Sequence, residues 1–181
     1  MLKRCKWCNL NNEKYVFYHD NEWCKFRCDN QYLFEMLILE SFQSGLSFEC
    51  ILNKRENFKI AYDNFDIDKI INYDDNKINE LLSNKNIIRN KLKIYASINN
   101  AKVFKQILNE YNNFYDYLTE FTNGNIFYET GLTKSNLSDM ISKDLIKRGM
   151  KFVGSITIYS YLQAIGIIYS HDKECYLYKE K

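Results

Sequence analysis

Residues 30–47 read NQYLFEMLILESFQSGLS, a helical pattern with apolar residues on nearly every side. Asn30 is placed to cap a helix that runs to about Phe42. A helix that is apolar all round is buried within a fold and does not lie on its surface. The residues that follow, Ser44-Gly45-Leu46-Ser47, break the helix. This stretch therefore predicts one deeply buried helix that ends in a glycine turn.

Glu40 is the unusual residue of this helix, because it lies on the same stripe as the apolar residues Leu33, Met36 and Leu37. A buried carboxylate costs several kcal/mol unless it is paired or protonated. Glu40 is therefore a candidate site residue with a perturbed pKa. The alternative is a structural role, as an ion-pair partner or as the cap of a neighbouring helix. Glu35, one turn earlier, is expected on the solvated side.

Further helices are predicted on both sides of this segment. The chain has no Pro and only 6 Gly among 181 residues, which favours helices over turn-rich sheets. We expect about seven helices in an all-α fold, with the first thirty residues loop-like and residues 111–137 unassigned. The other predicted helices start at caps or breaks and cover residues 47–62, a short piece from 66, residues 74–83, a long piece to 108, residues 138–149 and residues 155–168.

Positive charge is concentrated in one segment. The chain carries a formal net charge of +2, too small to identify a partner. From Leu81 to Asn109, however, there are cations and no acid; the cations are Lys85, Arg89, Lys91, Lys93, Lys102 and Lys105. Two helices joined by a tight hairpin here could bind phosphate through backbone N–H groups and nearby cations. The alternative is an ordinary helical hairpin with a solvated charged face.

The six cysteines and two histidines suggest a metal site. His171 and Cys175 are four residues apart, so one helical face or tight turn could hold both. With Cys5 and His19 they complete a Cys2His2 set, which is typical of structural zinc. Cys8 is the nearest rival of Cys5, Cys24 and Cys28 also compete as ligands, and six free thiols remain the alternative. No secretory signal or membrane span is visible, so we expect a cytoplasmic protein with reduced thiols.

Several longer motifs occur in order along the chain. They are Arg4-Cys5-x-Trp7, Tyr18-His19-Asp20-Asn21-Glu22-Trp23, Glu40-Ser41-Phe42-Gln43-Ser44-Gly45-Leu46-Ser47, Leu52-x-Lys54-Arg55-Glu56-Asn57, Asn86-Ile87-Ile88-Arg89-Asn90-x-x-Lys93-Ile94, Lys147-Arg148-Gly149-x-Lys151-Phe152-Val153-Gly154 and His171-x-x-x-Cys175. On these motifs the chain closely resembles the type I 3-methyladenine DNA glycosylases. The resemblance runs from about Arg4 to Cys175, and residues 111–137 carry little of it.

The resemblance implies one domain over residues 1–181, with a helix-hairpin-helix fold in two packed helical parts. The helix-hairpin-helix segment would cover about residues 75–108. A zinc ion would join residues 1–28 to residues 168–181. Its ligands, carried over by motif, would be Cys5, His19, His171 and Cys175, which decides between Cys5 and Cys8.

The implied activity is base-excision repair: hydrolysis of the N-glycosidic bond of 3-methyladenine in alkylated double-stranded DNA, after base flipping. Glu40 and Tyr18 would hydrogen-bond the extruded base as the catalytic pair. The substrate-binding residues would be Trp7, Trp23, Phe48, Gly45 and Leu46, and the DNA-binding residues would be Asn86, Ile87, Arg89, Lys91 and Lys93. Leu46 would fill the space left by the flipped nucleotide. The free base is the product, and we expect a monomer.

The chain departs from the family pattern in three places. The family usually has Trp where this chain has Phe48, and Asn86, which tolerates a left-handed backbone better than most residues do, replaces the hairpin glycine. Ser41-Phe42 replaces smaller or more polar residues next to Glu40. No Asp follows the hairpin between Asn86 and Glu110, and no motif places a Schiff-base lysine, so a monofunctional enzyme is expected. One alternative is a DNA-binding module of the same fold that has lost efficient excision, and Phe48 is the residue that favours it. The other alternative is a zinc-stapled helical interaction domain.

Overall fold

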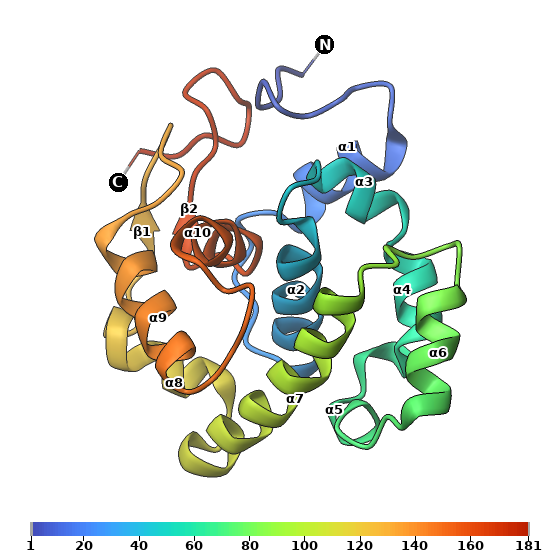
Figure 1. Cartoon of the computed structure of the whole chain (residues 1–181). Coiled ribbons are helices and arrows are strands. Elements are labelled where there is room, and N and C mark those ends of the chain that lie inside the picture. Colours follow the sequence, from blue (N-terminus) through green and yellow to red (C-terminus); the bar gives the residue numbers. More distant parts are fainter. Residues whose placement is uncertain (1, 181) are drawn as a thin grey trace.

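The computed structural model describes residues 2–180, and most of these residues lie in helices (Figure 1). In chain order the elements are α1 Glu13–Asn21, α2 Asn30–Gln43, α3 Phe48–Asn53, α4 Arg55–Ala61, a 3-10 turn Asp63–Phe65, α5 Ile67–Ile70, α6 Asp75–Ser83, α7 Lys91–Tyr111, α8 Phe114–Thr122, β1 Phe127–Tyr128, α9 Asn136–Lys147, α10 Ser155–Ala164 and β2 Ile168–Tyr169. Within the described residues, no helix is both long and apolar enough to cross a membrane.

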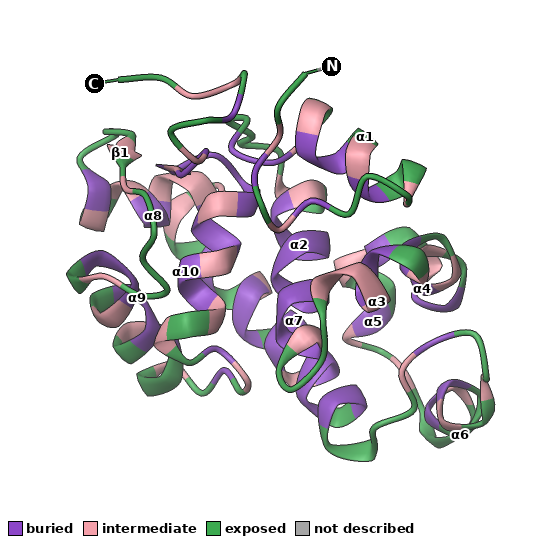
Figure 2. Ribbon diagram, turned by 90° about the horizontal axis from the view of Figure 1, so that it is seen from above, coloured by how far each residue is buried: buried purple, intermediate pink, exposed green. Residues whose placement is uncertain are grey.

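Helix α2 lies in the middle of the molecule and is buried along most of its length (Figure 2). It contacts α3 and α7 on one side and α8 and α10 on the other. The predicted buried helix is therefore confirmed. Its cap is Asp29, whose carboxylate accepts from the backbone N–H groups of Gln31 and Tyr32. Asn30 is the first helical residue, and its side chain instead accepts from the backbone N–H of Phe114.

Glu35 is buried, so the prediction of a solvated Glu35 is wrong. Its carboxylate accepts a 2.7 Å hydrogen bond from Nε of Arg55 on α4. The same guanidinium donates through Nη1 to Glu22 at 2.7 Å. A buried carboxylate is tolerated here because a cation from another helix neutralises it. The sequence of α2 alone carries no sign of that partner.

The segment between α6 and α7 forms the predicted hairpin. Asp74 caps α6 by accepting from the backbone N–H of Lys77 at 2.9 Å, and Asn90 caps α7 by accepting from that of Lys93 at 3.1 Å. Between the two helices, Ile87 is buried and anchors the turn. The predicted helix-hairpin-helix segment at about 75–108 thus coincides with α6, the turn and most of α7.

Other parts of the sequence-based assignment need correction. Helix α1 occupies a region predicted as loop, and the predicted helix over residues 47–62 divides at Lys54 into α3 and α4. Residues 111–137 contain α8 and β1. Strand β1 pairs in parallel with β2, so the mainly helical fold includes one two-residue strand pair where an all-α fold was predicted. These short elements carry too little periodicity to be recognised before their tertiary partners are known.

The two terminal segments of the chain meet at one end of the molecule (Figure 1). The backbone N–H of Tyr176 donates to the carbonyl of Lys3 at 2.8 Å. The backbone N–H of Lys6 donates to the carboxylate of Asp172 at 2.8 Å. Segments separated by more than 160 residues therefore form one local structure.

A close backbone approach fixes the end of α10. Gly166 has a φ of +77°, and a Cβ at this position would lie 2.3 Å from the backbone C of Lys25 and from the backbone N of Phe26. Only glycine fits, because any side chain would collide with another segment's main chain. The backbone N–H of Arg27 donates to the carbonyl of Ile165 at 3.0 Å across the same contact.

We predict that Gly166→Ala destabilises the fold much more than Gly131→Ala. Both glycines have a φ of +77°, but nothing lies within 4 Å of a Cβ at position 131. Gly131→Ala should cost only the left-handed conformation, ~1–2 kcal/mol. Gly166→Ala adds overpacking of ~1–3 kcal/mol, since backbone atoms must move. Urea unfolding of both variants measures the difference, and equal losses would contradict the close approach.

Candidate functional site

Four buried residues from the two ends of the chain form a Cys2His2 cluster: Cys5, His19, His171 and Cys175. The Sγ atom of Cys5 lies 3.4 Å from Nδ1 of His171. The Sγ atom of Cys175 lies 3.5 Å from Nδ1 of His171 and 3.5 Å from Nε2 of His19. The structure thus places the four predicted metal ligands close to one another. Cys8 has a different contact, a weak one from its Sγ to the carbonyl of Tyr15.

The geometry and chemistry of this cluster suit a metal ion. A tetrahedral zinc site with ordinary Zn–S and Zn–N bonds places sulfur and nitrogen ligands about 3.5 Å apart. Burial lowers the pKa of His19 and lowers that of His171 to about 4, so both imidazoles are neutral, as ligands must be. Asp20 contacts Nδ1 of His19 at 2.8 Å, which directs Nε2 toward the cluster. The four residues could therefore bind a metal ion.

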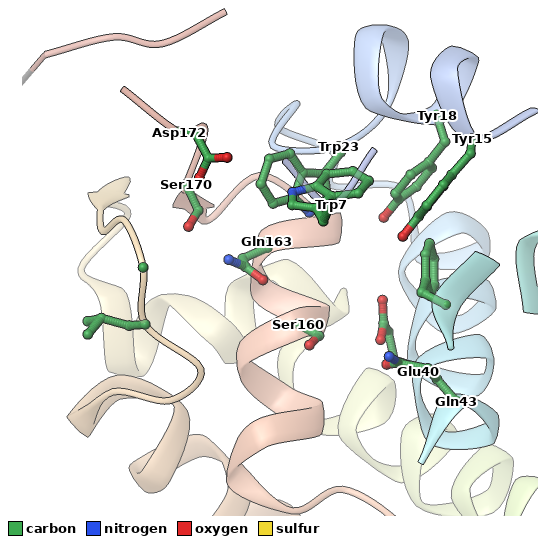
Figure 3. A pocket seen from close by; sticks show the side chains of 13 residues that line it. Trp7, Tyr15, Tyr18, Trp23, Glu40, Gln43, Ser160, Gln163, Ser170 and Asp172 are labelled. Carbon is green, nitrogen blue, oxygen red and sulfur yellow. The ribbon is translucent and has the colours of Figure 1, made fainter. Parts of the chain in front are cut away.

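A pocket of about 270 Å³ opens beside this cluster (Figure 3). Its walls come from the N-terminal segment, α1, α2, α3, α10 and three loops. The lining residues are Trp7, Tyr15, Tyr18, Trp23, Glu40, Gln43, Phe48, Gly131, Leu132, Ser160, Gln163, Ser170 and Asp172. This lining contains two carboxylates and no lysine or arginine. A pocket of this composition suits an aromatic or cationic ligand.

Aromatic side chains form two of the pocket walls. The rings of Trp7 and Trp23 meet edge to face, with centroids 4.7 Å apart. The rings of Tyr18 and Phe48 lie 5.0 Å apart, tilted by 46°. Trp23 also contacts the imidazole of His171 edge to face at 4.8 Å. The Cys2His2 cluster therefore supports the tryptophan wall directly from behind.

Glu40 reaches the pocket from α2, and its side chain is buried. Its Oε2 atom has no hydrogen-bond partner among the residues that the structure describes. Burial raises the pKa of this carboxyl to about 8. Burial also raises the pKa of Tyr18, so this phenol keeps its proton and remains a donor. At neutral pH both groups carry a proton, so the pocket can hydrogen-bond a polar ring edge, and Glu40 can ionise when a cation enters.

The turn after α2 lies outside this lining. Gly45 has a φ of +82°, and Leu46 is 41% exposed. The side chain of Lys93 fixes the turn from α7, because its Nζ donates to the carbonyl of Phe42 at 2.8 Å and also to that of Ser44. Lys93 is therefore buried against the end of α2, a different contact from the predicted one with phosphate.

The rest of the hairpin is exposed to solvent. Asn86, Arg89 and Lys91 lie at the surface, whereas Ile87 points into the core. The Nζ of Lys54 donates to the carbonyl of Asn86 at 3.2 Å. Asn86 has no positive φ, so the left-handed backbone that asparagine tolerates is not adopted there. Three of the predicted DNA-binding residues thus share one accessible edge of the molecule.

Sequence reasoning missed several residues of the pocket. Tyr15, Ser160 and Gln163 were not assigned, although Tyr15 lies one helical turn before Tyr18 on α1. Gln43 stood in a recognised motif without a role. Ser160 and Gln163 lie on α10, more than 110 residues after α2, and only the packing of α10 on α2 places them opposite Glu40.

A helical hairpin, α6 to α7, and an aromatic pocket with a buried carboxyl are features expected of DNA glycosylases, which recognise a base outside the helix stack. A sequence profile described as methyladenine glycosylase matches residues 7–178. The chain belongs to this methyladenine glycosylase family.

Individual relatives agree with this family. The chain is 37% identical over 183 residues to DNA-3-methyladenine glycosylase 1 of Escherichia coli (strain K12), covering 98% of this chain and 97% of that protein. A solved structure of 3-methyladenine DNA glycosylase I superposes with a TM-score of 0.93 at 35% identity, covering 98% and 100% of the two chains. A structure of the Staphylococcus aureus enzyme, described as the structural basis of 3-methyladenine recognition, has a TM-score of 0.89 at 30% identity and covers 96% of this chain and 97% of its own.

We predict that the buried Glu40 makes the protein less stable as pH rises from about 4.5 to about 8. Its folded pKa is raised to about 8 from 4.5, so in this window the folded state keeps a proton that the unfolded state has lost. At ~1.4 kcal/mol per unit, the loss could reach roughly 5 kcal/mol. Urea unfolding between pH 4.5 and 8 tests this against Glu40→Gln. The variant should lack this part of the pH dependence, and identical profiles would mean that Glu40 ionises normally.

Proposed function

We propose that this protein hydrolyses the N-glycosidic bond of 3-methyladenine in alkylated double-stranded DNA and releases the free base. The observation that carries the proposal is the uncommitted, buried carboxyl of Glu40 in an aromatic pocket. Relatives covering nearly the whole chain are named for this activity. 3-Methyladenine in DNA is cationic, and this pocket offers carboxylates and ring faces without a competing cation.

The chemistry follows from these groups. The damaged nucleotide leaves the stack, because its glycosidic bond is not accessible within the duplex. Its base enters between the aromatic walls, where Glu40 releases its proton to solvent and the carboxylate stabilises the positive charge of the base. Tyr18 donates a hydrogen bond to the same base. Water attacks C1′ of the sugar, and the N-glycosidic bond breaks with its electron pair passing to the base, which leaves neutral and therefore needs no strong general acid. The proton of the attacking water passes to solvent. No lysine lines the pocket, and we infer a monofunctional enzyme without strand cleavage.

The exposed hairpin supplies the DNA contact in this proposal. Backbone N–H groups around Asn86 and Ile87 would face phosphate, with Arg89 and Lys91 as the accessible cations. Lys93 acts indirectly by holding the turn that carries Gly45 and Leu46. The exposed Leu46 would then fill the space that the flipped nucleotide vacates.

We further infer that the Cys2His2 cluster binds one zinc ion with a structural role. The four ligands leave no open position for a water molecule, as in structural zinc sites. Such an ion would join the terminal segments and fix the wall formed by Trp7 and Trp23.

A second candidate is a binding module that recognises alkylated DNA with little excision. Phe48 favours it, because a phenyl ring gives a smaller stacking face than an indole, and this ring is tilted against Tyr18. Single-turnover excision from methylated DNA, with released bases separated by chromatography, distinguishes the two candidates. Excision of 3-methyladenine at an enzymatic rate supports the glycosylase, and tight binding without release supports the module.

We predict that Glu40→Gln lowers excision of 3-methyladenine by roughly 30- to 150-fold. This corresponds to the ~2–3 kcal/mol expected for a hydrogen bond to a charged group. Binding of the free base should weaken in parallel, while folding and metal content stay unchanged. Glu120→Gln on the exposed face of α8 is the matched control. Excision by Glu40→Gln at the parent rate would make Glu40 structural and remove the main support for this function.

We predict about one equivalent of zinc per chain in protein purified without added metal. Cys5→Ser and His171→Ala should each lose the ion, since one ligand of four is removed. Cys8→Ser should retain it, because Cys8 lies outside the cluster. Elemental analysis measures the content. Zinc retained in Cys5→Ser but lost in Cys8→Ser would overturn the ligand assignment.

We predict that the double variant Arg89→Glu, Lys91→Glu binds undamaged duplex DNA more weakly and with a shallower salt dependence than the parent. Removing two phosphate contacts should reduce the slope of log K against log salt by roughly 2. Lys143→Glu, Lys147→Glu on α9 changes the net charge equally but lies away from the hairpin. If both double variants bind alike, the hairpin is not the DNA-binding edge.

A further inference from the structure

The wall that faces Glu40 carries polar side chains from α10. Ser160 and Gln163 lie one turn apart on this helix and both line the pocket. Figure 3 shows the carboxamide of Gln163 directed into the pocket below the two tryptophans, with Glu40 on the facing wall formed by α2. Because α10 packs directly on α2, the two walls are held at a fixed separation.

The main chain of Gln163 is held by two backbone hydrogen bonds. Its carbonyl accepts from the backbone N–H of Cys24 at 2.9 Å and from that of Gly166 at 3.2 Å. Cys24 follows Trp23 directly, so Gln163 is held in register with the tryptophan wall. The close backbone approach of Gly166 to Lys25 and Phe26 lies at the same end of α10. The position of this residue is therefore set by the fold and does not depend on a bound ligand.

The side chain of Gln163, by contrast, has no internal hydrogen-bond partner. It is half-buried, and its carboxamide makes no hydrogen bond to any other residue among residues 2–180. Other amides in the protein are used internally; Asn100, for example, donates to the carbonyl of Lys151 at 2.8 Å and accepts from its N–H at 2.8 Å. A positioned amide without an internal partner is available to a ligand.

We propose that Gln163 is a specificity residue that hydrogen-bonds the base edge carrying the exocyclic amino group of 3-methyladenine. The inference rests on the proposed function and deepens it. A carboxamide presents one donor and one acceptor in a plane, and adenine presents an amino donor beside a ring-nitrogen acceptor. Glutamine can therefore pair with adenine through two parallel hydrogen bonds. Glu40 supplies charge for the cationic ring from one wall, and Gln163 recognises the identity of the base from the other.

The test compares the parent protein with one variant for the binding of two free bases. Gln163→Met removes both hydrogen-bonding groups at similar volume, and 3-methylpurine is the base without the amino group. Dissociation constants of both free bases are measured by quenching of Trp7 and Trp23 fluorescence, since both rings line the pocket. The parent should prefer 3-methyladenine, and Gln163→Met should lose roughly five- to tenfold of that preference, the value of one neutral hydrogen bond.

Two further variants sharpen the result. Gln163→Glu keeps an acceptor for the amino group and should retain the preference for 3-methyladenine. Gln106→Met, on the exposed face of α7, should behave as the parent. If Gln163→Met weakens both bases equally, or leaves both unchanged, Gln163 does not read the amino group and the proposal is overturned. If the parent itself binds neither base and excises none, the proposed function fails, and this inference falls with it.

Discussion

Burial of α2 is the constraint on which the arrangement of the site depends. This helix is surrounded by α3, α7, α8 and α10, so each of its polar residues must find a partner or remain neutral. Glu35 finds Arg55 on α4, and the pair links two helices in the interior. Glu40 finds no hydrogen-bond partner among residues 2–180, and burial raises its pKa to about 8. Two carboxylates on one helix thus acquire opposite properties, one as part of a structural ion pair and the other as an available group.

The end of α2 also connects the pocket to the exposed edge that carries the α6–α7 hairpin. The last carbonyls of the helix accept from the ammonium of Lys93, whose own helix begins at the hairpin. The burial of this ammonium lowers its pKa, and two carbonyl acceptors compensate for the lost hydration. The turn with Gly45 and Leu46 therefore sits in a fixed relation to the hairpin. A protein that extrudes a base needs such a rigid relation, because contacts to the DNA backbone must hold while the nucleotide moves.

The Cys2His2 cluster supports the opposite side of the pocket. It joins segments more than 150 residues apart, and its imidazoles contact the rings of Trp7 and Trp23. A metal ion bound by these four residues would therefore couple tertiary structure to the shape of the pocket.

The sequence by itself determined the main helix of the fold and most of the candidate site residues. A helix apolar on every side, a carboxylate on its stripe, a basic hairpin and a Cys2His2 set were all visible, because periodicity and residue type are local properties. Tertiary structure decided the rest. Only packing supplies Arg55 to Glu35, commits Lys93 to the end of α2, and brings Gln163 across from Glu40. A side chain's role depends on which groups approach it in space, and partners that lie tens of residues away leave no trace in the local pattern.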